Sequence, residues 1–174
     1  DIMHAFSSLS NSNAIGSDGF LPEIIKQNAV HLSIQLAYIF NLSFSQGIFP
    51  KILKSALVIP VYKSGSHSDP SNYRPISILT VFSKLLEKLY YNRLIAFIEK
   101  YQILHFNQFG FMKNKSTSSA VACLLSSLLN KCSTKIKTIL ALLDLKKAFD
   151  FINHNLLISK LQHYGTRGTL SYGS

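Results

Sequence analysis

The chain has 174 residues, of which 47% are hydrophobic and 15% are charged. This length allows one domain with a buried core and excludes two large domains. Eighteen Lys and Arg residues against eight acidic residues give a net charge of +10 at pH 7. Such an excess favours a polyanionic partner, with nucleic acid first and an acidic membrane surface second. A basic surface without a partner is the remaining alternative.

Cys123 and Cys132 match neither a metal-ligand pattern nor a disulfide framework, which fits a reduced, intracellular setting in the cytoplasm or nucleus. The sequence begins at Asp1 without a targeting signal, and we expect it to be a fragment. Residues 27–50 carry no charged side chain, but polar residues interrupt them and Gly47 ends the run early. A buried amphipathic helix is expected there rather than a membrane span.

The first half of the chain is predicted to form helices around one short strand. Residues 11–22 are rich in turn-forming residues and lead into a helix with Gly47 as its stop. Its apolar positions are Leu32, Leu36, Ile39, Phe40 and Phe44. Residues 56–61 are typical of a strand, and Pro60 places that strand at an edge or a bulge because proline cannot donate to a ladder. A polar loop follows.

The clearest helix is predicted over residues 77–100, where apolar residues recur every three or four positions. Its repeat comprises Leu79, Phe82, Leu85, Leu86, Leu89, Arg93, Leu94, Phe97 and Ile98. A loop containing Gly110 then precedes a helix that Ser116 or Thr117 can cap. That helix carries Val121, Leu124, Leu125, Leu128 and Leu129 on its apolar face.

Ile136–Leu143 is a continuous apolar run, which is typical of a central strand covered on both faces. If a neighbouring strand is lacking, its exposed edge should make the chain prone to aggregate. A last helix is expected from about Asn153 to Tyr164, with Gly165 just past its end. Helices, a short strand, a central strand and a final helix together predict an α+β fold.

Asp144 directly follows the apolar run, in the segment LALLDLKKAFD. A carboxylate at the end of a buried strand can meet metal ions and phosphates, as in two-metal phosphoryl transfer. The alternative is an ordinary strand-end or turn residue. Asp150 precedes the last helix, so N-capping is its default interpretation. A nuclease built on these two acids is disfavoured, because no third acid or His is placed to help.

Four segments occur in a characteristic order: GSDGFLPEIIK (16–26), LVIPVYKSGSHSDPSNYRPISILTVFSKLLEKLYYNRL (57–94), QFGFMKNKST (108–117) and LLDLKKAFDFINHNLLISKLQHYG (142–165). Together they resemble the reverse transcriptases of retrotransposons without long terminal repeats. The resemblance covers nearly the whole chain from Gly16 to Gly168. It implies helix-rich fingers and a partial palm of a right-hand polymerase fold, truncated. The fingers-like region would span about 1–135, the first palm strand and helix about 136–168, and a divergent tail 169–174.

The resemblance implies an RNA-directed DNA polymerase that takes an RNA template, a DNA primer and deoxynucleoside triphosphates. Asp144 would be a ligand to both catalytic Mg²⁺ ions, and the carbonyl of Leu145 would complete the shell of one of them. Phe149 would be the steric gate, an aromatic ring under the sugar that disfavours a 2′-hydroxyl. The alternative for Phe149 is an ordinary core aromatic.

Lys63 and Arg74 match the fingers cations that contact the incoming triphosphate in the family. An Arg guanidinium forks onto phosphate oxygens and a Lys ammonium acts as a mobile point charge, so both residue types suit that role. The alternative for either residue is a solvated basic loop.

Gln108, Phe109 and Gly110 match the segment near the template and the nascent base pair, and Gly110 would let the backbone come close. Met112 stands where family members often carry Arg. Lys113 or Lys115 could substitute for that contact.

The family also needs a later motif with two adjacent aspartates. The acids of this chain are Asp1, Asp18, Glu23, Asp69, Glu87, Glu99, Asp144 and Asp150, so none follows Asp150. Because one aspartate cannot hold two cations, we expect little or no polymerase activity from this chain alone. The alternative function is a non-catalytic, basic nucleic-acid-binding remnant of a transposable element, holding RNA or DNA through phosphate contacts.

Overall fold

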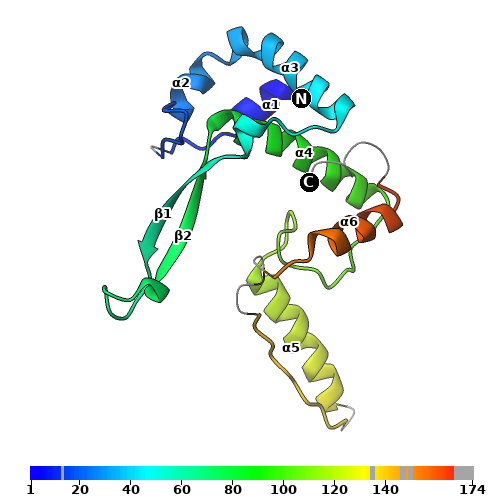
Figure 1. The fold of residues 1–174 in the computed structure, drawn as a ribbon. Coiled ribbons are helices and arrows are strands. Elements are labelled where there is room, and N and C mark those ends of the chain that lie inside the picture. Colours follow the sequence, from blue (N-terminus) through cyan, green and yellow to red (C-terminus); the bar gives the residue numbers. More distant parts are fainter. Residues whose placement is uncertain (13, 134–135, 146–147, 149–150, 167–174) are drawn as a thin grey trace. The chain divides into compact units, whose positions relative to one another are not determined.

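The computed structural model describes the chain except for residues 13, 134–135, 146–147, 149–150 and 167–174. Two compact units are distinguished: one comprises residues 1–96 and the segment that begins at Leu161, and the other comprises residues 97–160. The described residues form helices and a two-stranded sheet (Figure 1). This mixture confirms the predicted α+β composition in its coarse form. The divergent tail expected over 169–174 lies outside the described residues.

The first unit is built on α1 (Ile2–Ser7), α2 (Pro22–Gln27), α3 (Ala29–Gln46) and most of α4 (Val81–Lys100). Pro22 occupies the first turn of α2, where its missing N–H is harmless. Helix α3 ends as predicted at Gly47, whose φ of 66° is left-handed. The core they share comprises Ala5, Phe6, Ile25, Ala29, Leu36, Phe40, Val81, Leu85, Leu86 and Leu89.

Helix α3 buries only one of its faces. Leu36 and Phe40 lie in the core, whereas Ile39, predicted on the same face, is 46% exposed, because it falls on the flank of the helix. Within the described part of the chain, no helix combines the length and the apolar character that crossing a membrane requires.

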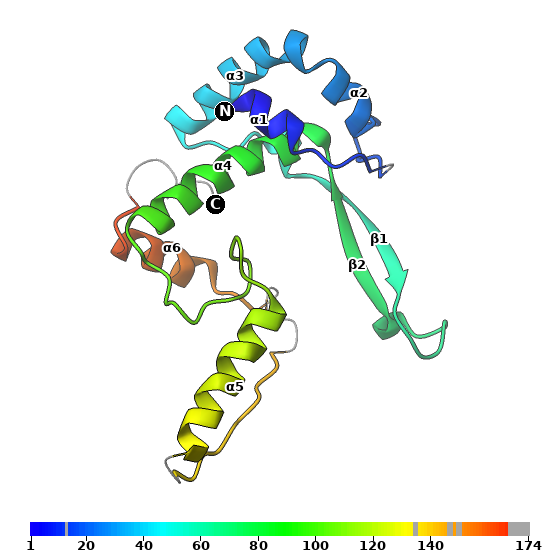
Figure 2. The same ribbon diagram turned by 180° about the vertical axis from the view of Figure 1, so that it is seen from behind.

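The β1–β2 hairpin consists of β1 (Ala56–Tyr62) and β2 (Tyr73–Leu79), paired antiparallel. The 3-10 turns η1 (Lys51–Lys54) and η2 (Pro70–Asn72) precede the two strands. Figures 1 and 2 show the hairpin extending away from the helices of its own unit. The predicted strand at 56–61 is confirmed. The predicted start of a helix at 77 is wrong, since residues 77–79 pair with β1 and α4 begins at Val81.

Two prolines face each other across the hairpin, Pro60 opposite Pro75. The N–H of Lys63 donates to the carbonyl of Asn72 at 2.8 Å, which fixes the alternation of bonded and non-bonded pairs. Lys63 and Asn72 form a bonded pair, and bonded and non-bonded pairs alternate along the hairpin. Three pairs further on, Pro60 and Pro75 therefore form a non-bonded pair. At a non-bonded position an N–H group would point away from the partner strand, so the prolines remove no hydrogen bond of the ladder. This confirms the predicted edge strand.

The second unit contains α5 (Thr117–Ser133), the first part of α6 (His154–His163) and long connecting segments. Ser116 caps α5, because its Oγ accepts the N–H of Ser119 at 3.1 Å. Helix α6 matches its prediction, but its N-cap is Asn153, whose Oδ1 accepts the N–H of Leu156 at 3.1 Å. Asp150, the expected cap, lies outside the described residues.

The strand predicted over Ile136–Leu143 is not formed. Residues 136–145 have no regular secondary structure and are exposed along their whole length. A strand needs a neighbour for its N–H and C=O groups, and the sheet of the described residues contains only β1 and β2, which pair with each other. The apolar pattern is thus present without the partner that would turn it into a central strand.

Candidate functional site

The base of the hairpin is fixed by a loop from far earlier in the chain. Oδ2 of Asp18 accepts the N–H of Val81 at 3.1 Å, so an acid 63 residues away caps α4. Its negative charge also suits the positive end of the helix dipole. A Cβ on Gly16 would lie 2.8 Å from the carbonyl oxygen of Leu79, so only glycine permits this approach.

A second brace joins the same junction to η1. Oγ1 of Thr80 accepts the N–H of Ser83 at 3.1 Å, and the buried hydroxyl of Ser83 donates to the carbonyl of Leu53 at 2.8 Å. Both strands of the hairpin therefore leave from a fixed root, because η1 leads into β1 and Thr80 follows β2.

Lys63 and Arg74 lie on the same face of the hairpin. Arg74 is opposite Val61, and the bond from Lys63 to Asn72 extends the ladder by one residue. Because side chains alternate between faces, these positions are diagonal neighbours, typically about 7–8 Å apart. Both side chains are exposed. The register of the hairpin could not be read from the sequence, so only the structure shows that these two predicted cations share a face.

The opposite face of the hairpin carries an aromatic cluster that orders its tip. The Tyr62 ring stacks on His67 at 4.0 Å and meets Tyr73 edge-on at 5.7 Å between centroids. The Tyr62 hydroxyl donates to the carbonyl of Gly65 at 2.6 Å, and the Tyr73 hydroxyl donates to that of His67 at 2.9 Å. Gly65 has a φ of 100°, and a Cβ there would lie 2.5 Å from Nδ2 of Asn72.

Asp69 is the one acid between residues 56 and 79. Its Oδ1 accepts the N–H of Ser71 at 2.9 Å, which caps η2. This backbone hydrogen bond lowers the pKa of the Asp69 carboxyl below its ordinary value of 3.8. The Asp69 carboxylate therefore binds a backbone N–H group of its own loop at the tip of the hairpin.

Gln108 and Gly110 lie in an exposed loop of the second unit. The N–H of Gln108 donates to the carbonyl of His105 at 2.9 Å, and its side-chain amide donates to the carbonyl of Gly110 at 3.0 Å. A Cβ on Gly110 would meet Nε2 of Gln108 at 3.7 Å, an ordinary contact. The loop itself does not require glycine, so any such requirement would come from a bound molecule.

Asp144 and Leu145 lie at the end of the irregular segment 136–145, and both are exposed. A carboxylate oxygen and a backbone carbonyl are hard ligands that suit Mg²⁺. However, no three His, Cys, Asp or Glu residues among those the structure describes come together as a metal site. Asp144 thus fits as one ligand and does not make a complete site. Phe149, the predicted steric gate, lies outside the described residues.

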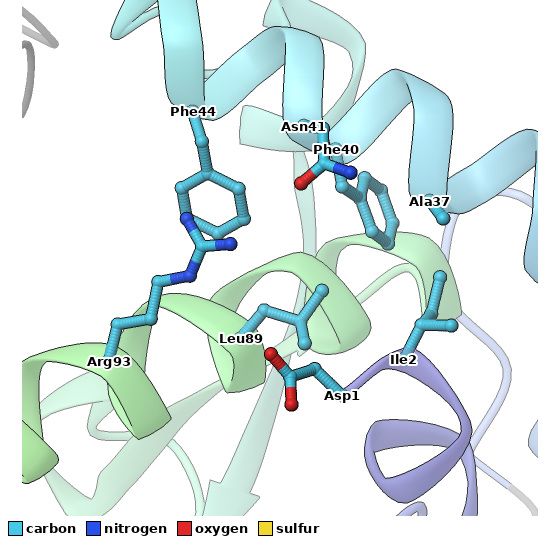
Figure 3. Close-up of a pocket in the computed structure, with 8 residues that line it drawn as sticks. All are labelled: Asp1, Ile2, Ala37, Phe40, Asn41, Phe44, Leu89 and Arg93. Atoms are coloured by element: carbon cyan, nitrogen blue, oxygen red, sulfur yellow. The ribbon is translucent and has the colours of Figure 1, made fainter.

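Sequence reasoning missed a pocket of about 210 Å³ between α1, α3 and α4 (Figure 3). The carbon at the centre of the Arg93 guanidinium lies 3.8 Å from the centroid of the Phe44 ring, a cation–π contact. One feature of the sequence could have indicated this pocket, namely that Arg93 occurs within the apolar repeat of α4. The pocket is lined by Asp1, Ile2, Ala37, Phe40, Asn41, Phe44, Leu89 and Arg93, none of which was predicted as a site residue.

Comparison with known proteins gives a match to the model of one family, reverse transcriptase (RNA-dependent DNA polymerase), over residues 61–172. The matched range covers more than half of the chain. It begins in β1 and includes both hairpin cations, the Gln108–Gly110 loop and Asp144.

Curated relatives extend the similarity to most of the chain. The probable RNA-directed DNA polymerase from transposon BS of Drosophila melanogaster is 34% identical over 93% of this chain and 18% of its own length. The RNA-directed DNA polymerase from mobile element jockey of the same species is 34% identical over 72% of this chain and 14% of its own length. A retrovirus-related Pol polyprotein from type-1 retrotransposable element R2 of Popillia japonica is 28% identical over 92% of this chain and 21% of its length. The chain spans about a fifth or less of these relatives.

Proposed function

This chain belongs to the reverse transcriptase (RNA-dependent DNA polymerase) family, and we propose that it supplies the fingers and the start of the palm of a retrotransposon polymerase with a right-hand fold. The relatives it matches are named as RNA-directed DNA polymerases of mobile elements. The partners of the complete enzyme would be an RNA template, a DNA primer and deoxynucleoside triphosphates. The net charge of +10 supports polyanionic partners of this kind.

The observation that carries the proposal is the shared face of Lys63 and Arg74. Two exposed cations on one face of a braced hairpin form a surface that can receive a triphosphate. The face is rooted by the Asp18 cap and the Ser83 brace, so its position does not rely on a free loop. The Arg74 guanidinium would donate two hydrogen bonds to phosphate oxygens, and the Lys63 ammonium would attract the same phosphate group as a mobile point charge.

In the complete enzyme, Asp144 and the carbonyl of Leu145 would be ligands of the catalytic magnesium ions, which stabilise the attacking and leaving oxygens of phosphoryl transfer. Phe149 would select against a 2′-hydroxyl. Gln108 and Gly110 would face the template and the nascent base pair. Because no group of three potential metal ligands forms around Asp144 among the residues that the structure describes, we infer that this chain binds nucleic acid and nucleotide without polymerising.

A second candidate function is a non-catalytic nucleic-acid-binding remnant, favoured by the high positive charge and the incomplete metal site among the described residues. The two candidates differ in nucleotide binding. A remnant needs only distributed phosphate contacts with RNA or DNA, whereas the polymerase part needs a localised triphosphate site.

Titration calorimetry with thymidine triphosphate and Mg²⁺ tests the proposal. We expect the double variant Lys63→Gln/Arg74→Gln to bind the triphosphate about tenfold or more weakly, because it loses charge-assisted contacts. The matched control Lys51→Gln/Lys54→Gln removes two charges from η1 and should bind as the unmodified chain does. Equal weakening in both variants would show a diffuse electrostatic effect and would refute the triphosphate face.

A further inference from the structure

One ammonium group, that of Lys115, makes several of the contacts that hold the loop of residues 105–116. Nζ of Lys115 donates to the carbonyl of Phe106 at 2.6 Å and to the carbonyl of Gln108 at 2.8 Å. The same Nζ lies 4.9 Å from the centroid of the Phe109 ring, within cation–π range. One side chain thus contacts three of the four residues from 106 to 109.

The backbone of this loop would not hold its shape on local preference alone. Phe111 has a φ of 60°, in the left-handed region that a bulky residue rarely adopts, and Asn114 has a φ of 62°, which asparagine tolerates better. Residues in such conformations persist where surrounding contacts enforce them. Lys115 supplies such contacts to residues on the other side of Phe111, so it closes the loop across this strained residue.

Lys115 is also tied to α5, since it immediately precedes the cap. The Oγ atoms of Ser116 and Ser119 accept each other's backbone N–H at 2.9 and 3.1 Å, a reciprocal cap of the helix. The ammonium therefore couples the Gln108–Gly110 loop to the first turn of α5. Lys115 is half-buried and Lys113 is exposed, and only Lys115 among these two reaches the loop's carbonyls.

We propose that Lys115 is a positioning residue that holds the Gln108–Gly110 loop in the shape that receives the template, and that its ammonium does not contact a nucleic-acid phosphate. The template role of the loop rests on the proposed function. Two of the three N–H donors of the ammonium are committed to carbonyls and its charge is set over a ring, which leaves it poorly placed to neutralise a phosphate.

Hydrogen exchange on the full chain tests the clamp itself. With Lys115→Met, which keeps the length and apolar stem, the amides of Asn107 and Gln108, which donate to His105, should exchange about tenfold faster, because the loop loses its bonds to a charged donor. Lys113→Met removes the same charge two residues away and should leave this exchange unchanged. Unaltered exchange in Lys115→Met would overturn the proposal without touching the proposed function.

Binding of a labelled single-stranded oligouridylate RNA, measured by anisotropy between about 50 and 200 mM KCl, separates positioning from phosphate contact. We expect Lys115→Met to weaken binding at every salt concentration with the salt slope unchanged, and Lys115→Arg to restore most of the affinity. A slope lowered by about 0.7 in Lys115→Met would mean a lost phosphate contact and would refute the proposal. If the unmodified chain fails to bind this RNA, the proposed function fails, while the exchange result still decides the clamp.

Discussion

Strand β1 and the segment 136–145 have similar apolar sequences, yet only β1 forms a strand. The difference lies in their partners. Strand β1 meets β2 after a ten-residue connection, so the entropic cost of closing that loop is small. Segment 136–145 has no strand beside it among the described residues. Apolar composition alone therefore does not make a strand, because strand stability comes from cross-strand pairs.

The same two regions differ in how they are anchored and protected. The hairpin is rooted by Asp18 and Ser83, and two prolines leave no outward N–H at the middle of its edges. Segment 136–145 has no proline, and Leu143 is 91% exposed. Each strand of the hairpin has its pairing partner, whereas the segment that carries Asp144 pairs with no strand among the described residues.

Substitution of leucine separates the two regions most strongly. Leu86 is fully buried in the core, so Leu86→Ala should lower the free energy of unfolding of the first unit by about 2–5 kcal/mol. Leu143→Ala, the matched control in segment 136–145, should change it by less than about 0.5 kcal/mol. Urea unfolding followed by circular dichroism measures both. Equal losses would show that segment 136–145 is packed in solution.

The root of the hairpin should be the next most sensitive place. Gly16→Ala sets a Cβ 2.8 Å from backbone at the junction of β2 and α4, where no flexible side chain can yield. We expect a loss of about 1–3 kcal/mol in the free energy of unfolding, as for other overpacked sites. Asp18→Ala should cost about 1 kcal/mol through the lost helix cap, and Asp18→Asn less, because its amide oxygen can still accept. A stability equal to that of the unmodified chain in Gly16→Ala would argue against this contact.

The helices were largely predictable because their information is local. Gly47 stops α3, Ser116 caps α5 and Gly165 follows α6, as the sequence indicated. Strand β2 was not predicted because it begins within a polar stretch and contains Pro75. In addition, its apolar last residues continue the apolar repeat of α4 in the sequence. The conformation of β2 depends on pairing with β1, and a short local stretch of sequence does not contain that information.

The candidate site was predictable as residue types but not as geometry. Lys63 and Arg74 were identified from a motif, but their common face depends on the register of the hairpin. The cap from Asp18 to α4 spans 63 residues and has no local signature. Lys113 or Lys115 was predicted as a possible substitute for the missing Arg, and only the structure shows that the Lys115 ammonium binds the chain's own carbonyls.

The hairpin tip offers a smaller, local test. Gly65→Ala forces a side chain into a left-handed conformation against Asn72, so the Tyr62–His67 stack should loosen. We expect a loss of roughly 1 kcal/mol, confined to the tip. Gly110→Ala is the control in the other unit, since its Cβ meets only an ordinary contact. Ring-proton shifts of His67 report the stack, and unchanged shifts in Gly65→Ala would contradict its dependence on this glycine.

The smallest expected effect is that of acid on the tip. Because the folded pKa of Asp69 lies below its ordinary value of 3.8, its hydrogen bond stabilises the loop above that value. The contribution is lost as the pH falls through 3.8 and below. The amide shift of Ser71 should therefore move between about pH 5 and pH 2 in the unmodified chain, and the movement should be absent in Asp69→Asn. The same movement in both proteins would assign it to another group.

Primer extension on an RNA template tests whether this chain binds nucleic acid and nucleotide without polymerising, as we propose. A gel shift first establishes that the chain has bound the primer–template, and Mg²⁺ and all four deoxynucleoside triphosphates are then added. We expect a bound primer that is not extended, because two-metal transfer needs several carboxylates and, in the described part of the chain, Asp144 belongs to no group of three potential metal ligands. Processive extension that disappears in Asp144→Ala would contradict this claim.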